Sequence, residues 1–283
     1  MAADVLTLSR GKLADFLACR RRFQLRYLRQ LPWPPAPPDE RVETAVSRGQ
    51  QFHQLVQRHF LGLPVDAAAL PDAQLRRWWE AFLRYRPALP AGEPLVEISL
   101  TVPVGRHLLL GRFDLLIVGE QNGAPFAHLF DWKTGRAQPP AALRDDWQTR
   151  LYLALLAEGG AALRPGSATL RPGSATLRPG SATLRPEHIN LTYWYASDPD
   201  TPRTIAYDAA WHARNWADIE AAVAQIDAEL AAGVWPLTDD LAQCRVCAYQ
   251  VYCGRQAAGA AAPEPDAEPE PPDLPLLFEP ELP

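Results

Sequence analysis

The chain has 283 residues, of which 47% are hydrophobic and 22% are charged. A chain of this length and composition folds as a globular protein and buries a core without disulfide staples. No segment has the apolar length of a membrane span, and the N-terminus lacks the apolar stretch of a signal peptide. We therefore expect a cytoplasmic protein without membrane association, whose thiols stay reduced.

The formal net charge of −5 is unevenly distributed along the chain. Residues 256–283 contain seven acids and neither Lys nor Arg, so the rest of the chain is slightly basic. Within residues 10–29 a single acid, Asp15, stands among seven cations: Arg10, Lys12, Arg20, Arg21, Arg22, Arg26 and Arg29. This stretch is either a face that contacts nucleic-acid phosphates or a solvated helix face.

The sequence pattern of the first third of the chain predicts helices. Ser9 is a suitable cap for a helix that runs to about Leu28, before the proline-rich stretch 32–38. Apolar residues at helical spacing predict two further helices, over 42–60 and 72–85.

From residue 95 onward the pattern changes to that of strands, predicted over 95–102, 107–118 and 125–132. A turn at Gln121-Asn122-Gly123 joins the last two strands. A helix over 144–158, a strand over 188–195 and a long helix over 208–230 complete the prediction. Helices flanking a short sheet indicate an α/β or α+β architecture.

Two segments stand apart from this core. Residues 163–183 are three tandem copies of Leu-Arg-Pro-Gly-Ser-Ala-Thr, and we interpret 163–186 as an expanded loop, because each Pro-Gly pair interrupts regular structure. Its arginines either contact DNA or belong to a functionless expansion. The acidic, proline-rich tail 256–283 is predicted to be disordered. Its apolar run at 273–279 is similar to the short peptides that bind the bacterial sliding clamp; alternatively it folds back or has no function.

Acidic residues on the apolar strands carry the main chemical signal. Asp114 closes the sequence Gly-Arg-Phe-Asp, and Asp131-Trp132-Lys133 follows on the next predicted strand. Buried carboxylates are costly unless paired or metal-bound, and two of them from adjacent strands can hold one Mg²⁺. Lys133 shares a strand face with Asp131, so its ammonium lies beside that site. For this pair alone, a surface salt bridge is an equally good interpretation.

Polar residues on two predicted helices complete a candidate site. His53 follows Gly49 on the helix before the sheet and is a possible further metal ligand. Gln148 and Tyr152 share a face of the helix after Lys133.

Taken in order, Gly49…His53, Gly-Arg-Phe-Asp114, Asp131-Trp132-Lys133-Thr-Gly and Gln148…Tyr152 resemble the RecB-like branch of the PD-(D/E)XK nucleases. The resemblance implies one nuclease domain over 1–255, with an α/β restriction-endonuclease-like core, a short mixed sheet flanked by helices, and an N-terminal helical region. It implies that His53, Asp114, Asp131 and the carbonyl of Trp132 bind Mg²⁺ or Mn²⁺. It also implies catalytic roles for Asp114, Asp131, Lys133, Gln148 and Tyr152, with Asp131 standing where the family often has Glu.

Four cysteines give a second signal. Cys244, Cys247 and Cys253 lie close together, and Cys19 stands alone near the N-terminus. Three close thiolates and a remote fourth are typical of a zinc or iron–sulfur site. The spacing resembles the [4Fe–4S] clasp of AddB-like and CRISPR-associated nucleases, which implies a cluster here, with zinc as the alternative occupant.

The resemblance implies a DNA nuclease of repair or recombination that acts on single strands or DNA ends. The alternatives are a CRISPR-adaptation nuclease that trims spacer precursors and a non-catalytic subunit that binds DNA ends. The sequence contains no phosphate-binding Walker A motif, so a helicase partner would be a separate protein.

Overall fold

The computed structural model describes residues 5–32, 40–70, 72–163, 175–176, 184–245 and 247–255. The chain divides into two units. One unit comprises Met1–Arg10 and Ser47–Val223, and the other comprises Gly11–Val46 and Ala224–Pro283. The first contains every strand found in the described residues, and the second contains all four cysteines.

The helices are α1 (Arg10–Ala18), α2 (Arg20–Phe23), α3 (Glu40–Phe60), α4 (Ala73–Tyr85), α5 (Pro140–Asp145), α6 (Trp147–Gly159), α7 (Ala209–Ala232) and α8 (Ala242–Arg245). The strands are β1 (Thr7–Ser9), β2 (Glu93–Val104), β3 (His107–Gln121), β4 (Ala124–Lys133), β5 (Ala175–Thr176), β6 (Ile189–Tyr195) and β7 (Asp198–Ala206). No helix in the described part of the chain combines the length and apolarity needed to cross a bilayer.

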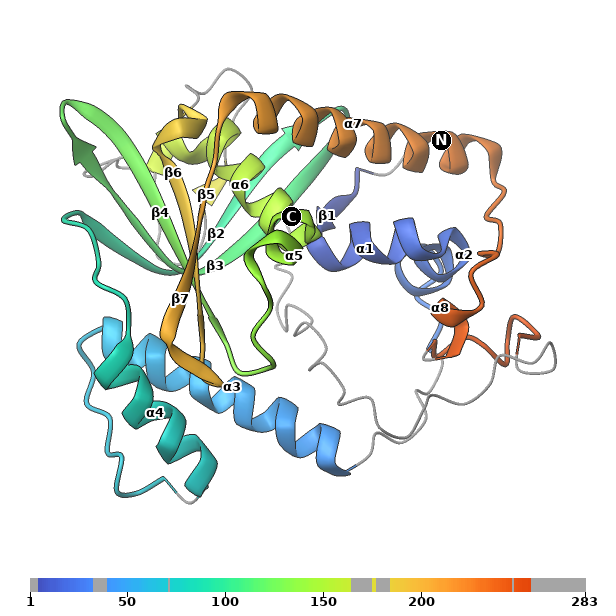
Figure 1. Cartoon of the computed structure of the whole chain (residues 1–283). Coiled ribbons are helices and arrows are strands. Elements are labelled where there is room, and N and C mark those ends of the chain that lie inside the picture. The colour runs from blue at the N-terminus through green and yellow to red at the C-terminus, as the bar shows by residue number, and fades with distance from the viewer. Residues whose placement is uncertain are drawn as a thin grey trace. The chain divides into compact units, whose positions relative to one another are not determined.

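The strands form one mixed sheet in the order β5-β2-β3-β4-β6-β7, with β1 beside β3 (Figure 1). The β2–β3, β3–β4 and β6–β7 pairs are antiparallel, and β4–β6 is parallel. The β3–β4 hairpin turns at Asn122 and Gly123, which have φ of 54° and 74°. Two consecutive left-handed residues are the signature of the tight hairpin turn that Asn-Gly favours.

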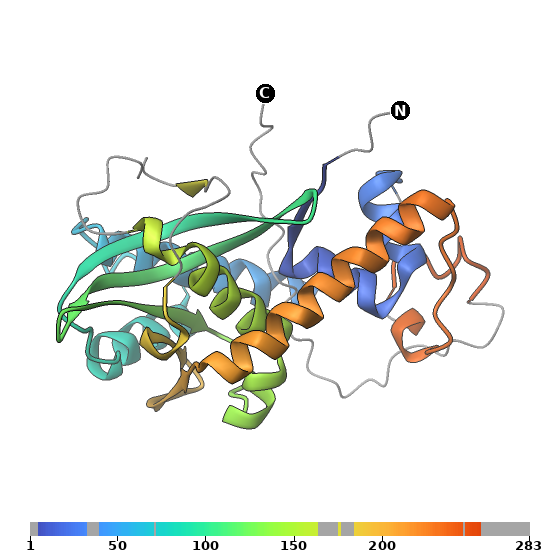
Figure 2. The same ribbon diagram turned by 90° about the horizontal axis from the view of Figure 1, so that it is seen from above.

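Helices cover both faces of this sheet. On one face α3 and α4 pack against β3, β4 and β6 around a mainly aromatic cluster: Phe52, Val56, Leu75, Trp79, Phe82, Leu115, Ile117, Phe130, Trp132, Trp194 and Ala196. On the other face α6 packs against β2, β3 and β6, and Figure 2 shows it lying over the strands. Each fully buried aromatic side chain in such a core contributes roughly 1.5–3 kcal/mol.

The N-terminal helix differs from its prediction. Instead of one helix over 9–28, the chain forms α1, α2 and a π-helical turn over Gln24–Leu28, and Ser9 belongs to β1. The break is at Cys19, which is extended at φ −161° and whose Sγ accepts the N–H of Arg22 at 3.4 Å. Cys19 therefore caps α2, a role that its place in an apolar helical pattern conceals.

β7 was also absent from the prediction. Its sequence contains two prolines and two aspartates, a composition that argues against a strand. Because β7 lies at the end of the sheet, its prolines need not donate hydrogen bonds to a second neighbour.

The repeat contributes one short strand. Ala175 and Thr176, at the end of the second copy, pair in parallel with Leu100 and Thr101 of β2. The remaining residues of the predicted 163–186 loop, apart from Leu163 and 184–186, lie outside the described residues, as does the tail 256–283 with its predicted clamp-binding run.

Candidate active site

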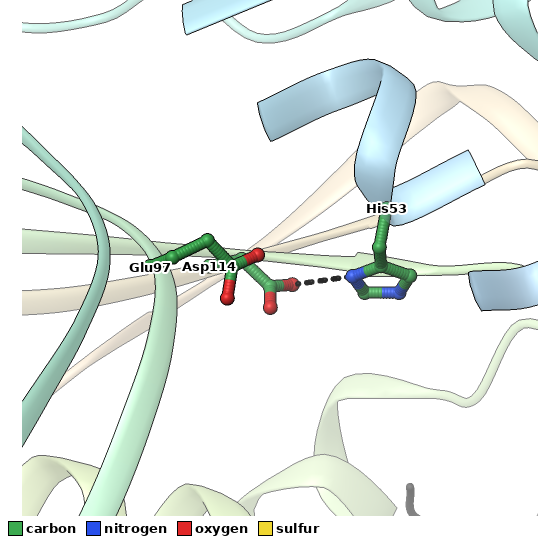
Figure 3. Close-up of side chains that lie close together, drawn as sticks. All are labelled: His53, Glu97 and Asp114. Atoms are coloured by element: carbon green, nitrogen blue, oxygen red, sulfur yellow. Dashed lines mark ion pairs between the residues drawn. The ribbon is translucent and has the colours of Figure 1, made fainter. Parts of the chain in front are cut away.

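Three side chains from different elements converge on the α3 side of the sheet. His53 comes from α3, Glu97 from β2 and Asp114 from β3, and one ligand atom of each lies within 4.8 Å of the others (Figure 3). Nδ1 of His53 is 3.4 Å from Oδ2 of Asp114. One imidazole nitrogen and two carboxylates at this spacing can bind a divalent cation.

A break in the alternation of β3 brings Asp114 to this side. Asp114 meets His53 of α3, yet the next residue, Leu115, packs in the cluster with Phe52 of the same helix. In a regular strand, neighbouring side chains point to opposite faces. β2 shows the same break, since Val96 packs against that cluster and Glu97 joins Asp114.

The backbone of Glu97 marks this break, because its φ is +51°. The left-handed region is rarely adopted by residues other than Gly, Asn and Asp, and it is concentrated at functional sites. The local twist of β2 is therefore part of how the two carboxylates are brought together.

Where the hydrogen-bonded pairing of β3 with β4 ends, backbone groups become available to the site. The last paired residues are Leu115 and Phe130. Beyond them, the N–H of Trp132 donates to Oδ2 of Asp114 at 3.0 Å instead of to a strand carbonyl. The sequence implied the carbonyl of Trp132 as a metal ligand; the contact that the structure gives comes from its amide. The Trp132 side chain lies in the aromatic core.

Asp131, Lys133 and Gln148 form a closed ring of polar contacts. Nζ of Lys133 lies 2.9 Å from Oδ1 of Asp131 and donates to Oε1 of Gln148 at 2.8 Å. Nε2 of Gln148 in turn donates to Oδ2 of Asp131 at 2.7 Å. Each member thus fixes the other two, and the amide orientation of Gln148 follows from having a donor on one side and an acceptor on the other.

Tyr152 lies one turn further along α6. Its hydroxyl is hydrogen-bonded to Gln148, and its ring meets Phe113 edge-on at 5.0 Å. Burial, together with the charges of Asp131 and Asp114, raises the pKa of Tyr152 far above its ordinary value, so the phenol stays neutral.

The glycines of the motifs allow close packing. A Cβ on Gly111 would lie 2.6 Å from Leu155 Cδ1, so glycine lets α6 approach β3. A Cβ on Gly49 would lie 3.1 Å from Thr134 Oγ1, so glycine lets α3 approach the residue after Lys133. Asp146 caps α6 by accepting the N–H of Gln148 at 2.7 Å, which fixes where this helix begins.

The carboxyl groups of the site have divergent proton affinities. Burial raises the pKa of Asp114, but the charge and hydrogen bond of His53 outweigh it and leave the pKa below its ordinary value. Burial also raises the pKa of Asp131, and Lys133 only partly opposes this, so the net shift is upward. Burial and the charge of Asp114 raise the pKa of Glu97 to about 7 against the opposing charge of Arg112.

The surroundings of His53 and Asp131 bear on whether a cation fits this site. Burial lowers the pKa of His53, but Asp114 more than offsets this and leaves it raised. Oδ1 of Asp131 is buried and forms no well-directed hydrogen bond, although Lys133 lies within ion-pair distance. Crowded carboxylates with an unsatisfied buried oxygen and raised pKa values are suited to a cation that neutralises them.

The structure brings the predicted site residues into two adjoining groups, one with His53 and Asp114 and the other with Asp131, Lys133, Gln148 and Tyr152. Glu97 is the residue that the sequence interpretation omitted. It is an acid within the predicted apolar strand 95–102, and that was the signal used to select Asp114 and Asp131. Applied evenly, the same argument selects Glu97 as well.

The predicted cysteine cluster is not supported by the structure. All four cysteines lie in the second unit, and burial, with added contributions from neighbouring thiols, raises the pKa of both Cys244 and Cys253. However, among the described residues, which include all four, no three cysteine sulfurs approach within 4.8 Å of one another. The thiols are neighbours and are not gathered into a ligand set.

The basic N-terminal stretch is partly neutralised within its own unit. Arg22 and Arg26 pair with Asp15 at 2.9 and 3.1 Å, and Arg20 pairs with Glu229 at 2.8 Å. These three arginines therefore serve internal contacts, which favours the structural interpretation for them over a free phosphate-binding face.

Comparisons with known proteins bear on this arrangement. The sequence profile of the PD-(D/E)XK nuclease superfamily matches residues 7–254. No curated protein matches the chain.

Among solved structures, the protein SSO0001 is 13% identical with a TM-score of 0.39, over 90% of this chain and 89% of that one. A "Putative exonuclease" from Eubacterium rectale is 11% identical with a TM-score of 0.49, over 84% and 86%.

The predicted architecture, a mixed sheet flanked by helices with a helical N-terminal region, is confirmed. Because the superfamily profile covers most of the chain, this protein belongs to the PD-(D/E)XK nuclease superfamily.

Proposed function

We propose that this protein is a metal-dependent deoxyribonuclease that hydrolyses phosphodiester bonds in single strands or at DNA ends, in repair or recombination. The observation that carries the proposal is the ring of Asp131, Lys133 and Gln148 next to the group of His53, Glu97 and Asp114. It combines an ammonium, a cation-binding set and a fixed amide, which are the parts that phosphodiester hydrolysis needs.

The donor set is suited to Mg²⁺ or Mn²⁺. His53 and Asp114 supply ligand atoms, Glu97 lies within reach of both, and the family resemblance adds Asp131 and the Trp132 carbonyl. Such a cation, when bound, polarises the phosphate and lowers the pKa of a bound water.

Lys133 is the group that we assign to positioning the water or stabilising charge on the phosphate. It is one of only two lysines in the chain, which otherwise uses arginine for its cations. Because the composition favours arginine so strongly, the choice of lysine at this position points to a specific role. An ammonium has three donors. One is donated to Gln148, and Asp131 holds the charge by an ion pair, which leaves a donor to reach a water or phosphate oxygen.

The decisive experiment compares Lys133→Arg and Asp131→Asn with the wild type on labelled single- and double-stranded DNA in Mg²⁺, Mn²⁺ and EDTA. We expect cleavage only with metal and a loss of about 100-fold or more in both variants. Arg84→Ala, which alters an exposed arginine of α4, is the control and should cleave normally. Full activity of Lys133→Arg or Asp131→Asn contradicts the assignment.

The same assay separates the alternatives. A non-catalytic subunit that binds DNA ends would bind labelled ends without cleaving them under any metal. A CRISPR-adaptation nuclease would trim overhangs to a defined length instead of degrading the strand. A helicase partner and attachment of the tail to a sliding clamp remain predictions, tested by pull-down with the full chain.

An iron–sulfur cluster held by Cys19, Cys244, Cys247 and Cys253 also remains a prediction. Four thiolates on one zinc ion would lie about 4 Å apart, given a Zn–S bond of roughly 2.3 Å. In a cubane each thiolate binds a different iron, so the sulfurs are farther apart, and the wider spacing of these cysteines argues more strongly against zinc. Metal analysis and the absorbance spectrum of anaerobically purified protein decide among iron, zinc and free thiols.

A further inference from the structure

Arg112 lies on β3 two residues before Asp114 and beside the carboxylate of Glu97. Its Nε donates to Oε2 of Glu97 at 2.8 Å, and its Nη2 lies 2.8 Å from the same oxygen. The guanidinium is therefore held at two points by one carboxylate oxygen that belongs to the candidate metal-binding group.

The guanidinium is only partly used by this contact. Arginine has five N–H donors in a planar fork. Within the described part of the chain, Glu97 is the one acceptor paired with Arg112, so its Nη1 group has no protein partner there. The Arg112 side chain is 45% exposed, whereas that of Glu97 is 15% exposed. The unused donors are thus accessible to solvent at the rim of the site.

We propose that Arg112 binds a phosphate of the DNA strand next to the scissile bond, and that Glu97 is the positioning residue that holds its guanidinium there. The inference rests on the proposed nuclease function and adds a substrate-binding residue to it. Arginine is suited to this role because its fork matches two phosphate oxygens at once.

The charge balance of the site supports this assignment. Three carboxylates lie close together, and they repel a polyanionic strand. Lys133 is engaged by Asp131 and Gln148, and Nδ1 of His53 faces Asp114. Arg112 is the most exposed cation of this group, and it is fixed in place before a strand arrives, which lowers the ordering cost of binding.

The left-handed backbone of Glu97 directs its carboxylate toward both Arg112 and Asp114. A residue at φ +51° in a strand is strained, and such strain persists where the surroundings over-determine it. The twist at Glu97 places its carboxylate against both Arg112 and Asp114, whose side chains lie on one stretch of β3. One strained residue therefore links the phosphate-binding arginine to the cation-binding acids.

The test measures binding of labelled single-stranded DNA in EDTA over a range of salt concentrations, so that no metal contributes. Each phosphate contact adds about 0.7 to the slope of log K against log salt for a single strand. We expect Arg112→Ala to lower the slope by about 0.7 and to weaken binding about tenfold or more. Arg84→Ala, with the same loss of charge, should leave the slope unchanged, and melting temperatures report on folding.

Conservative variants separate the two roles. Arg112→Lys should keep the slope and lose affinity, because a single ammonium cannot bind two oxygens. Glu97→Gln should keep the slope, because its amide oxygen still accepts from Arg112. An unchanged slope in folded Arg112→Ala overturns the inference while leaving a cleaving wild type intact. A wild type that neither binds nor cleaves DNA overturns the proposed function, and the inference with it.

Discussion

Glu97 of β2 lies across from Asp114 of β3, between the paired residues Val96–Leu115 and Ile98–Phe113, and its backbone φ is +51°. This relationship determines how the two carboxylates come to the same side of the sheet as His53. It also makes the position of Glu97 unlike any other in β2, since no other residue of that strand has a positive φ.

The first prediction tests this backbone strain. Glycine in a strand is usually roughly 0.5–1 kcal/mol less stable than alanine, whereas the left-handed region costs a non-glycine residue about 1–2 kcal/mol. We therefore expect Glu97→Gly to be more stable than Glu97→Ala by about 0.5–1 kcal/mol in urea unfolding. At Ser99, two residues further along β2 and without a positive φ, the order should be the normal one. The same order at both positions would show that Glu97 is not strained.

The second prediction concerns the approach of α3 to the end of β4. In a helix interior, Gly→Ala usually stabilises by about 1 kcal/mol, but a Cβ at Gly49 would meet Thr134 Oγ1 at 3.1 Å. We expect Gly49→Ala to raise the free energy of unfolding by less than this in the wild type and by the full amount in the Thr134→Ala background. The difference between the two backgrounds should be about 0.5 kcal/mol or more. Thr134→Ser keeps the oxygen and should keep the penalty. Additive effects in all backgrounds would rule out the contact.

The third prediction concerns the ring around Gln148. Gln148→Glu keeps the side-chain shape and an acceptor for Lys133, but it replaces the donor to Asp131 with a second carboxylate oxygen. We expect a loss of about 1–3 kcal/mol at pH 8. The repulsion raises a carboxyl pKa, so the lost stability should return as pH falls toward 5 and a proton binds.

Gln54→Glu, on an exposed position of α3, serves as the control for the Gln148 variant. It should show neither the loss at pH 8 nor the recovery at lower pH. If Gln148→Glu is as stable as the wild type at both pH values, the donor and acceptor assignment of the ring is wrong.

Periodicity predicted most of the sheet and its covering helices, because β2, β3, β4, β6, α3, α4 and α7 have the apolar spacing of their class. It failed where a single residue overrides the pattern. Cys19 interrupts an apolar helical stripe by capping α2, and β7 is a strand only because its edge position tolerates prolines. Neither effect is visible in local composition.

The residues of the site differ in how far the sequence alone predicts them. Asp114, Asp131 and Lys133 follow from acids and a lysine on apolar strands, whereas His53 and Gln148 needed a family resemblance, since one histidine or glutamine on a helix carries little signal. The role of Glu97 depends on a backbone dihedral and a register, which arise only after β2 and β3 have paired. The proposed role of Arg112 depends on its ion pair with Glu97, so the sequence alone did not predict it either.

The last prediction concerns His128, away from the acids of the site. The side chain is stacked on Phe130 at 4.3 Å between ring centroids, and its Nε2 lies 2.8 Å from Thr192 Oγ1, which in turn meets Thr204. Burial lowers the pKa of His128 to about 4 from an ordinary value of 6.5. The fold therefore favours the neutral imidazole, and protonation opposes folding.

The sign of the pH effect follows from this lowered pKa. The stability that the neutral form contributes is fully present above pH 6.5 and is lost as pH falls toward 4. Between pH 8 and pH 5 this group alone removes about 2 kcal/mol. His128→Gln keeps a hydrogen-bonding group near Thr192 but does not titrate, so its urea midpoint should fall less over this range. Equal losses in the two proteins would mean that His128 is protonated in the folded chain as readily as in the unfolded one.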